Sequence, residues 1–367
     1  MPIDSKVRKV IKKQGHIKID EMMRQILSVN KGSYYRTKKD IGAKGDFITA
    51  PEISQLFGEV TAFWAIEQWE KMGCPKPFLL LELGPGQGVL MQDLLRVAKL
   101  KPEFFAAANI HLLEINPYFK AKQKSNLNIY GKELTWLKSI NEIPKIPIIM
   151  IANEFFDAMP IKQYKKIKKK WYESTMVIDP LDGRIKYSNI AIKERLEKQL
   201  NQDHPNAKDG AIFEESIESL EIVRFLARHI KKYTGSSLII DYGYDIATKS
   251  RQRGQYNSTL QAIKNHQYHS VIDSMGEADL TAHVDFQALK KAARQQGIKE
   301  YDIYNQAGFL QKYGIILRYQ NLQKKLPADE KQILAKQLYR LTDKTQMGEL
   351  FKVLVIANFQ TLMLSDN

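Results

Sequence analysis

The stretch that decides the fold is Phe78-Leu79-Leu80-Leu81-Glu82-Leu83-Gly84-Pro85-Gly86-Gln87-Gly88. Its first six residues are a near-continuous apolar run, which is typical of a strand covered on both faces of a sheet. Glycines at positions 84, 86 and 88 follow and open a helix. Because glycine lacks a Cβ atom, the backbone can turn sharply there and approach a ligand closely. The start of the helix offers free N–H groups, so the turn predicts an anion or ligand site.

Three further strand-like runs alternate with helical patterns along the chain. They lie at Ile110-His111-Leu112-Leu113-Glu114, at residues 146–152 and at residues 237–242. Strand–helix repetition of this kind implies a parallel sheet with right-handed crossovers. The sequence therefore predicts an α/β fold.

Interruptions of this rhythm predict three parts. Residues 1–75 are expected to form an N-terminal helical segment and a flap that covers the ligand. Residues 76–160 and 233–367 are expected to form the sheet core. Residues 161–232 are expected to form an insertion of a hairpin plus helices, because Asp182-Gly183 is a hairpin signal between alternating residues.

The spacing of the glycines indicates which ligand the turn takes. A dinucleotide fingerprint needs its third glycine at position 89, where this chain has Val89. The pattern here, with Glu82 before it, is similar instead to the S-adenosylmethionine sites of Rossmann-like methyltransferases. Glu114 ends the second strand, and its carboxylate is suited to accept two hydrogen bonds from ribose hydroxyls. The alternatives are a tight turn without a ligand and, for Glu114, a solvated loop acid.

Composition excludes several classes of protein. The chain has 367 residues, of which 44% are hydrophobic and 26% charged, as in an ordinary globular protein. Cys74 is the single cysteine, so no intramolecular disulfide can form and no metal site is expected. No apolar run approaches the ~20 residues of a membrane span. We see no signal or transit peptide, so the expected location is the cytoplasm, as for a bacterial-type protein.

The net charge of +15 raises the question of a nucleic acid or acidic partner. The densest run of lysines lies within residues 162–170, without a ladder of aromatic residues beside it. We interpret this run as a solvated strand face or hairpin, and nucleic acid as an improbable partner.

Five segments together resemble the MidA family. They run in order across the chain, at residues 45–54, 81–86, 152–158, 240–243 and 279–286. The members of this family are S-adenosylmethionine-dependent protein arginine methyltransferases that act as assembly factors of respiratory complex I. The resemblance implies a class I methyltransferase fold with a seven-stranded, mostly parallel sheet. It also implies S-adenosylmethionine as cofactor, and as substrate an arginine of the 49-kDa-type subunit, which becomes symmetrically dimethylated. The oligomeric state is not indicated.

The loop Asn153-Glu154-Phe155-Phe156-Asp157 follows a predicted strand, where ligands of α/β proteins bind. A protonated guanidinium is a poor nucleophile, so carboxylates must orient it and localise its charge. We assign this catalytic role to Glu154 and Asp157, and we expect Asn153 to contact the donor or the acceptor. For Asp157 the alternative is the cap of a following turn.

Two further sets of residues complete the predicted site. Asp46, Phe47, Thr49, Pro51 and Glu52 look like a flap that closes over the donor, and the alternative is a surface loop that caps the helix starting at Pro51. His283 is predicted to take a proton or orient an acid, and the alternative is a packed hydrogen-bonding residue.

The chain departs from the family pattern over residues 258–276, which leaves the predicted donor residues intact and falls on the acceptor side. Three rival functions stay open at this point. The first is a donor-binding assembly factor or chaperone without essential chemistry, the second a nucleic-acid methyltransferase, and the third a small-molecule methyltransferase. Against the second, Asn-Glu-Phe-Phe is unlike the Asn-Pro-Pro-Tyr loop that grips a flipped base.

Overall fold

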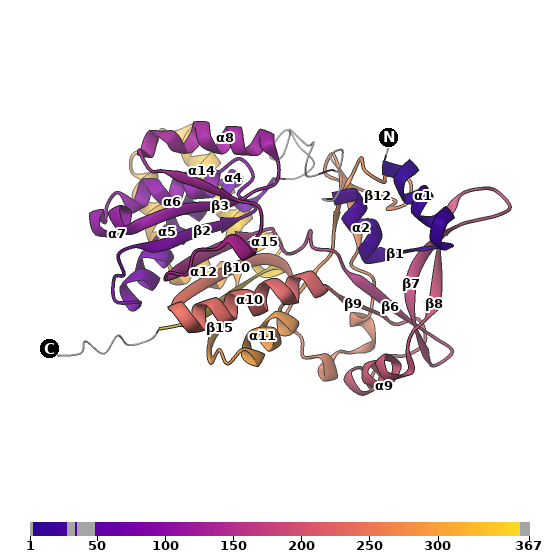
Figure 1. The fold of residues 1–367 in the computed structure, drawn as a ribbon. Helices are drawn as coiled ribbons and strands as arrows, with labels where there is room; N and C mark the ends of the chain where they lie inside the picture. The colour runs from indigo at the N-terminus through magenta and orange to yellow at the C-terminus, as the bar shows by residue number, and fades with distance from the viewer. Residues whose placement is uncertain (1–2, 28–33, 35–47, 360–367) are drawn as a thin grey trace. The chain divides into compact units, whose positions relative to one another are not determined.

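The computed structural model describes residues 3–27, 34 and 48–359, and these fall into two compact units (Figure 1). The larger unit comprises residues 41–156, 222–243 and 289–367, and the smaller unit residues 1–40, 157–221 and 244–288.

A large mixed sheet is the centre of the larger unit, where seven strands lie in the order β15-β16-β10-β5-β2-β3-β4. The pairs from β10 to β4 are all parallel, whereas β16 is antiparallel to both of its neighbours. The bounds of these strands are β2 Phe78–Leu83, β3 Ala108–Leu113, β4 Leu134–Leu137, β5 Ile148–Asn153, β10 Gly235–Tyr244, β15 Glu300–Asn305 and β16 Phe351–Asn358.

The apolar run of residues 78–83 forms β2, and all six of its residues are buried, as are the six residues of β5. The core beside these strands includes Trp69, Phe78 and Phe104, with the Trp69 and Phe104 rings in edge contact at a centroid distance of 5.7 Å. The helices around the sheet are α4 Ala50–Ile53, α5 Gln55–Lys71, α6 Val89–Ala98, α7 Pro102–Ala107, α8 Pro117–Leu127, α10 Ile217–Tyr233, α11 Phe286–Gln295, α12 Gln306–Lys312, α13 Ile315–Gln323, α14 Ala328–Thr342 and α15 Met347–Leu350.

The smaller unit has two antiparallel sheets, in the orders β1-β7-β6-β9, with β8 beside β7, and β12-β11-β13. The lysine run forms the β6–β7 hairpin, and Lys168 and Lys169 make its turn with φ of 48° and 68°. The elements are α1 Ile3–Gln14, β1 Ile17–Lys18, α2 Ile19–Leu27, β6 Lys162–Ile167, β7 Lys170–Ile178, β8 Ile185–Ala191, α9 Glu194–Asp203, β9 Ile212–Glu215, β11 Gln261–Lys264, β12 Gln267–His269, β13 Asp279–Thr281 and β14 Val284–Asp285.

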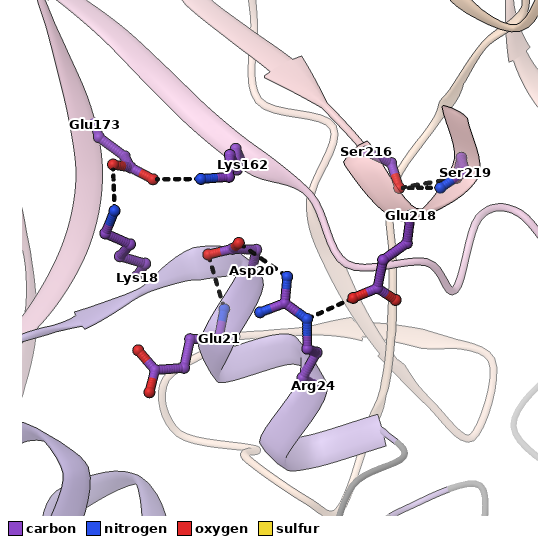
Figure 2. A network of polar contacts seen from close by, with 9 residues as sticks. All are labelled: Lys18, Asp20, Glu21, Arg24, Lys162, Glu173, Ser216, Glu218 and Ser219. Atoms are coloured by element: carbon purple, nitrogen blue, oxygen red, sulfur yellow. Dashed lines mark hydrogen bonds and ion pairs between the residues drawn. The ribbon is translucent and has the colours of Figure 1, made fainter. Parts of the chain in front are cut away.

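A polar network ties α2 to the rest of the smaller unit (Figure 2). The Arg24 guanidinium donates to Asp20 at 3.0 Å and to Glu218 at 2.5 Å. The Glu173 carboxylate accepts from Lys18 at 2.8 Å. Because Asp20 and Glu173 are buried, these pairs hold the N-terminal helices in place more firmly than exposed pairs do.

The division of the chain differs from the expected 1–75, 76–160 with 233–367, and 161–232. Residues 1–40 group with the hairpins because Ile17 of β1 pairs with Met176 of β7, and both residues are buried in one core. Residues 244–288 join the same unit. The end of α10 instead belongs to the larger unit, where His229 Nε2 lies 2.9 Å from the Ile146 carbonyl oxygen.

None of the helices within the described ranges combines the length and the apolar character that crossing a membrane requires.

Candidate functional site

The glycine turn connects β2 to α6 in a backbone conformation that side chains disfavour. Gly84, Gly86 and Gly88 have φ of +63°, +51° and +81°. Only glycine visits this region routinely without a steric cost. A Cβ atom on Gly84 would lie 2.8 Å from Cδ2 of Phe155, closer than real Cβ contacts. The sequence therefore uses glycine at this end of β2 both for the turn and for close packing.

Glu82 and Glu114 lie at the carboxyl ends of neighbouring parallel strands, since Leu83 of β2 is in register with Leu113 of β3. Glu82 is 3% exposed, and its Oε2 atom has no hydrogen-bond partner among the described residues. Burial, together with the nearby Glu114 carboxylate, raises the pKa of Glu82 to about 8. Burial also raises the pKa of Glu114, which accepts a hydrogen bond from the Asn116 backbone at 2.7 Å. A cationic ligand group beside Glu82 would relieve this unfavourable arrangement of two acids.

Gln123 of α8 joins the glycine turn to Glu114, and the sequence analysis missed it. Its Nε2 donates to the Gly86 carbonyl at 2.7 Å and to Glu114 Oε2 at 3.3 Å, and its Oε1 accepts from Trp136 Nε1 at 2.7 Å. A signal was present, because Gln123 stands four residues from both Phe119 and Leu127 on the buried face of α8. A polar side chain at such a position must be hydrogen-bonded, and here its partners are the site's own residues.

The loop after β5 holds Asn153 and Glu154 at the same edge of the sheet. Glu154 has a φ of 49°, an uncommon conformation for a residue with a side chain. Its Oε1 accepts from the Ala50 backbone and from Asn153 Nδ2, each at 3.2 Å. Asp241 of β10 fixes the loop by accepting from the Phe156 backbone N–H at 3.0 Å. The Oδ1 atom of Asn153 is buried and has no hydrogen-bond partner in the part of the chain that the structure describes.

The segment at α4 bridges these two loops. Gln87 of the glycine turn donates to Glu52 Oε1 at 3.2 Å, and the Thr49 backbone donates to Glu52 Oε2 at 3.4 Å. Burial raises the pKa of Glu52. With the bond from Ala50 to Glu154, these contacts place Thr49 and Pro51 beside the predicted donor loops. Asp46 and Phe47, the other predicted flap residues, lie outside the described residues.

Asp157 and His283 belong to the smaller unit, whereas the residues of the glycine turn and of the β5 edge belong to the larger unit. The Ala282 backbone donates to the Asp157 carbonyl at 2.9 Å, so the chain segments of Asp157 and His283 meet. The His283 backbone donates to Thr259 Oγ1 at 2.9 Å, and burial lowers the pKa of His283. Their catalytic roles stay predictions.

The glycine turn lies at the carboxyl end of a central parallel strand, which is where open α/β sheets bind nucleotide-like ligands. Residues 60–304 match the family described as "Putative S-adenosyl-L-methionine-dependent methyltransferase". The chain belongs to this family, and its methyl donor is S-adenosylmethionine.

Curated relatives cover nearly the whole chain. A protein of Drosophila melanogaster named "Protein arginine methyltransferase NDUFAF7 homolog, mitochondrial" is 30% identical over 95% of this chain and 83% of its own length. The proteins named "Protein arginine methyltransferase NDUFAF7, mitochondrial" of Danio rerio and Homo sapiens are 33% and 31% identical, covering 94% and 96% of this chain and 84% and 82% of their own lengths.

A crystal structure of a protein from Burkholderia thailandensis, bound to S-adenosyl-homocysteine, has a similar fold. It is 23% identical, with a TM-score of 0.84 over 97% of this chain and 92% of that one. A mixed α/β fold with a large sheet is thereby shown for this chain.

The relatives correct one expectation. We expected a cytoplasmic protein, but the fly, zebrafish and human relatives are all named as mitochondrial. The prediction of a cytoplasmic location is therefore wrong on this comparison.

The residues at the sheet edge fit the donor. Glu82 Oε2 and Asn153 Oδ1 are buried acceptors without a partner among the described residues, at the carboxyl ends of the neighbouring strands β2 and β5. Within the described ranges, no group of three His, Cys, Asp or Glu side chains could hold a metal ion.

Proposed function

We propose that this chain is a protein arginine methyltransferase built on a Rossmann-like class I core. The names of the curated relatives support a protein arginine as the methyl acceptor, because the alignments with these relatives cover more than nine-tenths of the chain. The strand order, with β16 alone reversed, supports the class I core. The observation that carries the proposal is the pair of unpartnered buried oxygens, on Glu82 and Asn153, at the edge where the glycine turn lies.

In this proposal the larger unit holds the donor. Glu82 and Asn153 accept hydrogen bonds from the amino group of its methionine end. Glu114, fixed by Gln123, accepts from the ribose hydroxyls. Gly84, Gly86 and Gly88 let the backbone approach the ligand, and the segment with Thr49 and Pro51 covers it and excludes water.

Bound there, the donor supplies a sulfonium methyl group for in-line displacement. The acceptor nitrogen gains the methyl group and loses a proton, and the sulfur keeps the electron pair of the broken bond. The role of the protein is to hold the guanidinium close to the methyl group and dry. Glu154 pairs with the guanidinium and turns one nitrogen toward the methyl group. Asp157 shares the orientation of the guanidinium, and His283 accepts the released proton.

By family resemblance, we further propose that the acceptor is an arginine of the 49-kDa-type subunit of complex I, that it is symmetrically dimethylated, and that this supports assembly of the complex. Mass spectrometry of that subunit, from cells with and without the gene, tests the assignment. The proposal predicts a dimethylarginine that is lost with the gene and is not restored by a Glu154→Gln variant. An unmethylated subunit in both strains would contradict the assignment of the substrate.

Recovery of complex I with the Glu154→Gln protein, without methylation, would instead favour an assembly factor whose chemistry is dispensable. The strains with and without the gene, together with the strain that carries Glu154→Gln, therefore separate the two functions.

A further inference from the structure

The larger unit contains a cavity of about 600 Å³ that lies among α4, α6 and α14 and borders the glycine turn at Gln87. Its described lining includes three acidic residues, Glu52, Asp93 and Glu330, and no lysine or arginine. This composition is unusual for a chain with 56 basic and 41 acidic residues. We call this feature the acidic cavity.

Two of its three carboxylates have no cationic partner among the residues that the structure describes. Asp93 is paired with Arg96 at 2.6 Å, so its charge is already balanced. Glu52 accepts from Gln87 and from the Thr49 backbone, which are both neutral donors. Glu330 is exposed and makes no ion pair with any residue of the described part of the chain. Within the described ranges, therefore, neither Glu52 on the α4 side nor Glu330 on the α14 side is paired with a cation.

The α14 wall also presents apolar surface to solvent. Ile333, one turn after Glu330, is 56% exposed, and the buried Leu334 lies beside it. Ile53 and Val89 line the opposite wall. An exposed aliphatic side chain next to a free carboxylate suits a long cationic side chain, whose stem packs on the apolar surface while its head meets the acid.

The acidic cavity shares residues with the donor loops. Gln87 lines the cavity and belongs to the glycine turn, and it donates to Glu52 Oε1 at 3.2 Å. The Gln87 carbonyl accepts from Asn126 Nδ2 at 2.9 Å, which holds the turn from the α8 side. A molecule bound to Glu52 would therefore lie next to the glycine turn, because Gln87 of that turn is hydrogen-bonded to Glu52.

We propose that the acidic cavity docks a basic, arginine-bearing peptide segment of the protein substrate. This inference rests on the proposed function, because it takes the acceptor to be a protein. Guanidinium groups match the carboxylates and the side-chain amides of the lining, and leucine-like side chains match Ile333. A nucleic acid or an acidic peptide would meet like charges there.

The test is fluorescence anisotropy with a labelled peptide of alternating arginine, glycine and leucine, on the full chain. Glu330→Lys should weaken its binding about tenfold, because the variant reverses one of the uncompensated charges. Asp329→Lys is the matched control, since Asp329 is also exposed in the first turn of α14 but does not line the cavity. Ile333→Ser tests the apolar contact and should also weaken binding. Gln332→Ser is its control, because Gln332 is exposed beside it but does not line the cavity.

Binding weakened by Glu330→Lys and Ile333→Ser, but not by their controls, would support the proposal. Equal effects of each variant and its control, no binding to the wild type, or equal binding of a peptide with citrulline in place of arginine would overturn it. Calorimetric titration with S-adenosylmethionine is run on the same variants. If the wild type does not bind S-adenosylmethionine, the result counts against the proposed function. If the wild type binds S-adenosylmethionine but Glu330→Lys and Ile333→Ser leave peptide binding unchanged, the result counts against the acidic cavity alone.

Discussion

The substitution Gly84→Ala adds one Cβ atom at the closest backbone approach in the candidate site. Two costs follow from the structure. A side chain at the φ of +63° costs roughly 1–2 kcal/mol. Overpacking against Phe155, whose Cδ2 would lie 2.8 Å from the new atom, adds about 1–3 kcal/mol. Gly86→Ala is the matched control, because Gly86 has a φ of +51° and nothing within 4 Å of an added Cβ.

Urea denaturation measures the difference in the free energy of unfolding between the two variants. Gly84→Ala should be less stable than Gly86→Ala by about 1–3 kcal/mol, the overpacking part alone. Replacing Phe155 by alanine should remove most of that difference. Equal stability of the two glycine variants, with or without the Phe155 ring, would refute the reasoning about close packing at this turn.

Three further predictions follow from buried polar groups. The pKa of Glu82 is raised to about 8, and the ammonium group of the donor needs the ionised carboxylate. The affinity for S-adenosylmethionine, measured by calorimetry, should therefore rise by up to about tenfold per pH unit from pH 6 to 8. The Glu82→Gln variant should bind weakly at every pH and lack this dependence. Gln123→Leu leaves the Gly86 carbonyl and the buried Glu114 carboxylate without this donor and should weaken the binding of S-adenosylmethionine about tenfold in the same titration. Arg251 forms an ion pair with Asp285 inside the smaller unit, and Arg251→Met should lower the free energy of unfolding of that unit in urea by about 3–5 kcal/mol. Arg184→Met is the control, because Arg184 pairs with Asp182 on the surface, and it should change the same free energy by less than about 0.5 kcal/mol. Similar losses in the two variants would contradict this account.

The strand and turn at residues 78–88 could be predicted because their signals are local. A run of apolar residues and three glycines specify β2 and its turn without information from the rest of the chain. β5 also carries a continuous apolar run, and in β3 buried apolar residues alternate with more exposed ones, which is why both strands could be found.

The grouping of the chain could not be predicted, because it depends on contacts between distant segments. Residues 1–40 look like an independent helical segment by periodicity, but the two residues of β1 pair with β7 more than 150 positions away. Pairings this short leave no pattern of their own in the sequence.

Gln123 marks the limit of prediction for the site. Its role depends on the distance between α8 and the glycine turn, which only the folded chain defines. Glu82 and Glu114 could be found because each ends a recognisable strand, whereas the mutual effect on their charges needs the register of β2 and β3.

The most direct test of the central claim is calorimetric titration of the purified protein with S-adenosylmethionine, beside Gly86→Val and Gly131→Val. Both glycines have a positive φ and no atom within 4 Å of an added Cβ, but Gly131 follows the short helix Asn128–Tyr130, away from the turn. The account predicts micromolar binding to the wild type and to Gly131→Val, and its loss in Gly86→Val. Unchanged binding to Gly86→Val would contradict a donor site at the glycine turn.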